Sequence, residues 1–133
     1  MRSKYITFIK EANGRYLRIS GSYKECFGVD PVKIINRTSY ECYDYEVARE
    51  FEEGDTYAIA SGQTDTRIIN WPHCDGHTML WMVKKISLKD DLILGVAFDI
   101  TAYMRNHSSG DLLMPMNTAH TMMLESFLTC SSA

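Results

Sequence analysis

The stretch Leu92-Ile-Leu-Gly-Val-Ala-Phe-Asp-Ile-Thr101 decides the fold of this chain. Even-numbered positions from Leu92 to Ile100 are all bulky and apolar, whereas the odd-numbered positions carry mostly small residues such as Gly95 and Ala97. Side chains of a β-strand point alternately to its two faces. A strand without a strongly polar face is covered on both sides, so we expect this strand, extended to Tyr103, to be covered by other elements on both faces.

Four further strands precede this one. Asn13-Gly14, a strong hairpin turn signal, joins the predicted strands 5–10 and 16–20. Pro72–Gly76 joins the predicted strands 64–71 and 78–88, and Asp90-Asp91 forms the next tight turn. The chain therefore predicts a five-stranded antiparallel sheet, for which the order 2-1-5-4-3 is economical.

Helical patterns fill the middle of the chain. Two short helices are predicted around 22–28 and after Asp30-Pro31, and a longer helix over Tyr45–Ser61, ended by Gly62. The acidic run within 41–55 fits either a solvated helix face or an acidic binding surface. Strands with helices grouped between them predict an α+β fold with the helices on one face of the sheet.

The tail has a different composition. Residues 106–133 carry only Asp111 and Glu125 as charged side chains, and Asn117 could cap a final helix whose stripe includes Met122 and Phe127. We therefore expect two parts, a sensor domain over 1–105 and a linker with a C-terminal helix over 106–133.

Composition limits the range of functions. The chain has 133 residues, the size of one domain, and 14 basic against 17 acidic residues, which argues against a surface for the nucleic-acid backbone. No apolar run approaches the length of a membrane span, and no signal-peptide block begins the chain, so a cytoplasmic protein without membrane contact is expected. The four cysteines form no CxxC pair and are expected to be free thiols.

Several short motifs occur in an order typical of one known family. They are Asn13-Gly14-Arg15, Phe27-Gly28, Ser61-Gly62, Asp75-Gly76 with Trp81, and the closing Gly95-Val-Ala-Phe-Asp-Ile-Thr101. Over residues 5–103 the chain resembles a PAS domain. The resemblance implies a sensory or interaction module, often dimeric and often joined to an effector such as a DNA-binding domain or a kinase.

Cofactors that PAS domains commonly carry do not match these residues. Residues 1–72 contain no histidine, although heme-binding members usually hold iron through a histidine on the long helix. Cys26 and Cys42 lack the Asn-Cys-Arg-Phe-Leu context of the flavin-binding branch. No metal is expected either, because His73, Cys74 and His77 supply only three zinc ligands and Asp75 already has a turn role.

The resemblance places one face of the sheet against the helices, where small residues would leave room for a small, mostly apolar ligand. The residues predicted to line this space are Phe27, Ile59, Met79, Trp81, Val83, Lys85, Gly95 and Ala97. Lys85 would either pair with a polar group of the ligand or extend its ammonium group to solvent. Trp81 would either stack on a flat ligand or fill the core.

The opposite face of the sheet is apolar and is expected to be shielded from water by either the tail helix or a second subunit. We therefore predict a homodimer interface formed by Leu94, Val96, Phe98, Met122 and Phe127. The leading hypothesis is a sensor that signals through dimerisation to an effector in bacterial transcription regulation or two-component signalling. A ligand-free dimerisation module is the alternative, and an enzyme ranks last because no catalytic constellation is recognisable.

Overall fold

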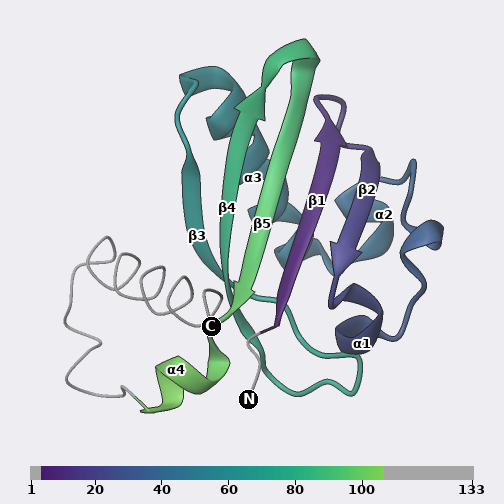
Figure 1. The fold of residues 1–133 in the computed structure, drawn as a ribbon, viewed down its shortest axis with the longest axis vertical. Helices are drawn as coiled ribbons and strands as arrows, with labels where there is room; N and C mark the ends of the chain where they lie inside the picture. The colour runs from purple at the N-terminus through teal and green to yellow at the C-terminus, as the bar shows by residue number, and fades with distance from the viewer. Residues whose placement is uncertain (1–3, 107–133) are drawn as a thin grey trace, which may run out of the picture.

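A computed structural model describes residues 4–106 and confirms the predicted α+β fold (Figure 1). The sheet has five strands in the order β2-β1-β5-β4-β3, and all neighbouring pairs are antiparallel. The strands are β1 (Tyr5–Glu11), β2 (Tyr16–Gly21), β3 (Asp65–Asn70), β4 (Leu80–Leu88) and β5 (Leu92–Asp99). The central position of β5 explains why its sequence is apolar on both faces.

Helices α2 and α3 lie against one face of the sheet, behind the strands in Figure 1, whereas η2 lies in the turn between β4 and β5 and α4 follows β5. The helices are α1 (Tyr23–Phe27), η1 (Pro31–Lys33), α2 (Ser39–Cys42), α3 (Tyr45–Ser61), η2 (Lys89–Asp91) and α4 (Thr101–Asn106). The long helix α3 has the predicted bounds and ends where Gly62 adopts a left-handed φ of 68°. Its buried stripe includes Val47, Phe51 and Ala58.

Gly95 shows how tightly the sheet and helix layers are packed. In the strand register Gly95 is opposite Phe8 of β1 and Lys85 of β4. A Cβ atom at this position would overlap the ring of Phe8. The expectation that small residues on this face leave room for a ligand is therefore wrong at Gly95, because the Phe8 ring occupies the space.

The fifth strand is shorter than predicted. It ends at Asp99, whose Oδ1 accepts hydrogen bonds from the backbone N–H (3.0 Å) and the hydroxyl (2.7 Å) of Thr101. These bonds form an Asx turn at the end of the strand, and Tyr103 belongs to α4 and not to the strand.

Helix α4 covers one end of the outer face of the sheet. Met82 and Ile100 are buried there, and the partly buried Tyr103 and Met104 pack against the same cluster. The predicted C-terminal helix lies outside the described residues. Within 4–106, none of the helices combines the length and the apolar character needed to cross a membrane.

Candidate ligand pocket

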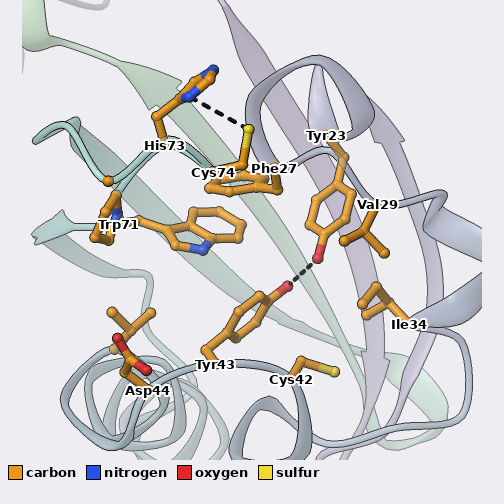
Figure 2. A pocket seen from close by; sticks show the side chains of 13 residues that line it. Tyr23, Phe27, Val29, Ile34, Cys42, Tyr43, Asp44, Trp71, His73 and Cys74 are labelled. Carbon is orange, nitrogen blue, oxygen red and sulfur yellow. Dashed lines mark hydrogen bonds between the residues drawn. The ribbon is translucent and has the colours of Figure 1, made fainter.

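A pocket of about 500 Å³ opens between helix α1, the segment that follows it, the start of α3 and the β3–β4 loop (Figure 2). Each of these segments lies between regular strands, so the pocket is built largely from connections. Its lining residues are Tyr23, Phe27, Val29, Ile34, Cys42, Tyr43, Asp44, Val47, Trp71, Pro72, His73, Cys74 and Gly76.

Aromatic rings form one wall of the pocket. Phe27 and Trp71 are stacked, with ring centroids 4.3 Å apart and 23° between their planes. Tyr43 meets Trp71 edge to face at 5.3 Å. Trp71 is fixed from behind, because the indole N–H of Trp81 donates to the Trp71 carbonyl at 3.1 Å. The wall is therefore held in place before any ligand binds.

The polar groups of the pocket are mostly uncharged. The hydroxyls of Tyr23 and Tyr43 lie 3.0 Å apart within hydrogen-bonding distance. Burial raises the pKa of Tyr23 to about 12 and holds the pKa of Tyr43 well above its usual range, so both remain protonated at neutral pH. Burial also raises the pKa of the Cys42 thiol.

Formal charge at the pocket is restricted to its rim. Asp44 supplies an exposed carboxylate, and no lysine or arginine is among the lining residues. A neighbouring hollow of about 520 Å³ shares Val29, Ile34 and Cys42 with the pocket but has a charged lining, formed by Lys33, Arg37 and Glu41. The two hollows thus differ in the charge they can accommodate.

Of the residues predicted to line a cavity, Phe27 lines this pocket. Met79, Trp81, Val83, Lys85 and Ala97 are buried on the inner face of the sheet, as the alternation predicted, yet they are not among the lining residues. Contact of these residues with a ligand stays a prediction. The placement of Ile59 in the interior is wrong, since this side chain is 43% exposed on α3. It lies about 100° around the helix from the buried Ala58.

Lys85 has a partner within the protein. Its side chain is only 1% exposed, so it does not extend to solvent, and that alternative is wrong. Its ammonium group lies 2.6 Å from Asp55 Oδ1 of α3 and donates to the Phe51 carbonyl. Burial lowers the pKa of Lys85 to about 8, and the Asp55 carboxylate opposes this shift.

A second buried lysine meets the same carboxylate. Lys10 of β1 is fully buried, and its Nζ lies 2.5 Å from Asp55 Oδ2 and 3.3 Å from Glu52 Oε1. Asp55 therefore joins two strands to helix α3 through one carboxylate. Sequence reasoning missed Lys10, although its spacing after Ile6 and Phe8 places it on the same buried face.

The outer face of the sheet carries the residues predicted for a dimer interface. Leu94, Val96 and Phe98 are partly buried in the described protomer. Met122 and Phe127 lie outside the described residues. A homodimer through this face stays a prediction.

Comparison with known proteins identifies the family. A family model described as the PAS fold matches residues 2–104. The chain belongs to the PAS family. A search of the curated proteins gives no match. The solved structures with a similar fold include PAS domains.

Three solved structures with a similar fold illustrate the range of sequence identity and coverage. The PAS domain of the RpfR quorum-sensing receptor from Cronobacter turicensis, in complex with BDSF, has a TM-score of 0.64 at 14% identity, over 76% of this chain and 98% of that one. VqmA bound to DPO has a TM-score of 0.64 at 22% identity, over 74% of this chain and 52% of VqmA, so this PAS chain spans about half of VqmA. Cycle PAS-B of Drosophila melanogaster with ethylene glycol has a TM-score of 0.59 at 15% identity, over 71% and 98% of the two chains.

Proposed function

We propose that this PAS domain is the sensory module of a signalling protein and that its pocket binds a small, neutral aromatic or heteroaromatic molecule. The observation that carries the proposal is the lining itself. Stacked rings and protonated hydroxyls form the walls, and no lysine or arginine is among the lining residues. Among the described lining residues, an anionic ligand would meet no lysine or arginine and would lie near the Asp44 carboxylate.

The size and the aromatic lining of the pocket support a small ring-containing ligand. A volume of about 500 Å³ falls within the usual range for small-molecule sites. The half-buried rings of Phe27 and Tyr43, with the nearly buried Trp71 beside them, line the pocket and offer ring contacts, each worth about 0.5–1.5 kcal/mol beyond area burial. The hydroxyls of Tyr23 and Tyr43 share one hydrogen bond, which leaves the pair one free O–H donor and oxygen lone pairs as acceptors to orient a carbonyl, hydroxyl or ring nitrogen.

Two similar structures, the RpfR PAS domain with BDSF and VqmA with DPO, hold small molecules, which supports a ligand-binding role. The signal would pass to an effector through the outer face of the sheet by dimerisation.

Our second candidate is a ligand-free dimerisation module, which is favoured by the exposure of Ile86 (39%) and Leu88 (40%) on β4. Sedimentation at several concentrations tests dimerisation, and a monomer at the highest concentration would refute both the second candidate and the proposed signalling route.

A matched pair of compounds tests the charge argument. Indole-3-carboxamide and indole-3-carboxylate have the same ring system and nearly the same size, and they differ by one negative charge. We expect the carboxamide and related neutral compounds to raise the melting temperature more than their carboxylates. Preferential stabilisation by the carboxylates would refute the proposal and direct attention to the hollow that contains Lys33 and Arg37.

Two tryptophan substitutions on one helix locate the site. Val47→Trp places an indole into the pocket and should abolish the response to neutral compounds. Ile59→Trp adds the same side chain at an exposed position of α3 and should leave the response unchanged. Circular dichroism checks that both variants fold. An equal response from both folded variants would contradict the assigned pocket.

A further inference from the structure

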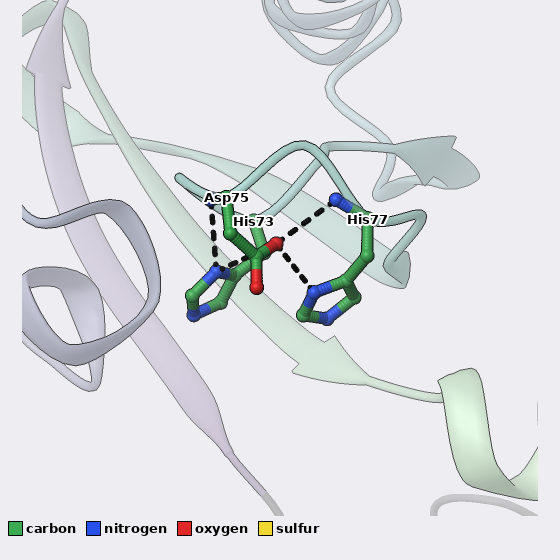
Figure 3. Close-up of side chains that lie close together, drawn as sticks. All are labelled: His73, Asp75 and His77. Carbon is green, nitrogen blue, oxygen red and sulfur yellow. Dashed lines mark hydrogen bonds and ion pairs between the residues drawn. The ribbon is translucent and has the colours of Figure 1, made fainter.

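The β3–β4 loop gathers three side chains that can bind a metal ion (Figure 3). Asp75 Oδ1 lies 3.2 Å from Nδ1 of His73 and 2.5 Å from Nδ1 of His77. One ligand atom from each of the three residues lies within 4.8 Å of the other two. The two imidazole rings are stacked with centroids 4.6 Å apart. The Nδ1 atom of each ring faces the same carboxylate oxygen.

The loop backbone already holds this arrangement. The His73 N–H donates to the His77 carbonyl at 3.1 Å, and the Gly76 N–H donates back to the His73 carbonyl at 2.8 Å. Gly76 adopts a φ of 92°, which the turn requires. The ligands are thus brought together before an ion arrives, which lowers the ordering cost of binding.

From this geometry we propose that His73, Asp75 and His77 form a binding site for a divalent transition-metal ion such as Zn²⁺. Zinc binds imidazole nitrogen and carboxylate oxygen at about 2.0–2.2 Å, which separates the donor atoms of a tetrahedral site by roughly 3.3 Å. The His73–Asp75 separation of 3.2 Å fits this value. His77 must retreat by less than about 1 Å, which its half-exposed side chain allows.

The donor set selects the class of metal. Two imidazole nitrogens and one carboxylate suit zinc, nickel or copper, whereas magnesium and calcium prefer oxygen ligands. Binding replaces the 3.2 Å hydrogen bond from the Asp75 N–H to His73 Nδ1. Three protein ligands leave further coordination positions open to water.

The location of the site gives it a structural consequence. His73 lines the aromatic pocket, whereas Asp75 and His77 are exposed on the same loop and are not among the lining residues. A bound ion would cross-link His73 to His77 and stiffen the rim of the pocket. This inference does not depend on what the pocket binds.

Equilibrium dialysis of the untagged 133-residue chain against Zn²⁺ alone tests the site. We expect one equivalent bound to the wild type and at least a tenfold weaker affinity in His77→Asn and in His73→Asn/His77→Asn. The matched control His107→Asn removes a histidine from another part of the sequence and should bind like the wild type. Equal binding by the wild type and the double variant would overturn the proposal, and so would an equal loss in His107→Asn.

Two further measurements keep the test decisive. Asp75→Asn retains a side-chain oxygen for the turn while removing the charge. This variant should therefore fold but bind zinc more weakly than the wild type. With Co²⁺ as the probe, the visible d–d bands should change from the wild type to His77→Asn. Identical Co²⁺ spectra and unchanged affinity in these variants would refute the assignment.

Discussion

Replacing Asp55 by asparagine should destabilise this domain more than any exposed substitution on α3. The carboxylate is nearly inaccessible to solvent and lies 2.5 Å from Lys10 Nζ and 2.6 Å from Lys85 Nζ. Asparagine keeps the shape but removes the negative charge, so two buried ammonium groups lose their shared partner. Lys10 retains Glu52 at 3.3 Å, whereas Lys85 retains the Phe51 backbone carbonyl and the Phe51 ring, whose centroid lies 4.7 Å from its Nζ.

The magnitude follows from the cost of breaking a buried ion pair, about 3–5 kcal/mol when one partner is removed. Because the free energy of unfolding of a domain is typically about 5–15 kcal/mol, this is a large fraction of the total. It corresponds to a fall in melting temperature of at least about 10 °C.

Chemical denaturation of four variants separates charge from packing. Lys85→Met should cost less than Asp55→Asn, because Asp55 keeps Lys10 and methionine fills a similar volume. The double variant should regain part of the loss of Asp55→Asn, since one of the two unpaired cations is gone. Glu46→Gln, an exposed carboxylate on the same helix, is the control and should change little. If Asp55→Asn unfolds at the same denaturant concentration as Glu46→Gln, the reasoning is refuted.

Three further predictions concern the core and the pocket. Gly95→Ala should lower the free energy of unfolding by at least about 2 kcal/mol in denaturant titrations, because its Cβ would overlap the Phe8 ring; a neutral effect would show that the packing at Gly95 is wrong. The pKa of Lys85 is lowered from 10.5 to about 8, so between these pH values the unfolded state binds more protons than the folded state. As the pH rises from about 8 to 10.5, the free energy of unfolding of the wild type should therefore increase by up to about 3 kcal/mol relative to that of Lys85→Met. If the difference in melting temperature between the wild type and Lys85→Met stays constant across that pH range, the burial of this ammonium group is contradicted. Tyr43→Phe should cost about 1 kcal/mol by loss of the bond to Tyr23, measured by urea unfolding, whereas a gain in stability would argue against that bond.

The sheet could be predicted from the sequence because its signals are local. Alternation in 92–99 and the turn residues between strands predict which residues face the helices, and the order 2-1-5-4-3, chosen as the economical one, is the order observed. The same alternation could have revealed Lys10, which follows Ile6 and Phe8 at intervals of two. The end of β5 is less predictable, because Ile100, Thr101 and Tyr103 after Asp99 suit a strand as well as a helix.

The pocket could not be predicted in the same way. Trp71, Tyr43 and Tyr23 come from segments far apart in the chain, and only the folded structure brings their rings together. Gly95 shows the opposite difficulty, because its size suggested an empty space and the register with Phe8 fills it. The β3–β4 loop was identified by its histidines, but the direction of both rings toward Asp75 depends on the turn geometry.

The central claim is that a neutral ligand binds against Trp71, and ¹⁹F NMR of 5-fluorotryptophan-labelled protein tests it most directly. The chain has only two tryptophans, so the spectrum should contain two signals, and Trp71→Phe assigns them. On titration with a neutral compound that stabilises the protein, the Trp71 signal should move in a saturable way and by more than the Trp81 signal, because Trp71 lines the pocket and Trp81 lies behind it. A stabilising compound that leaves the Trp71 signal unmoved would contradict the account.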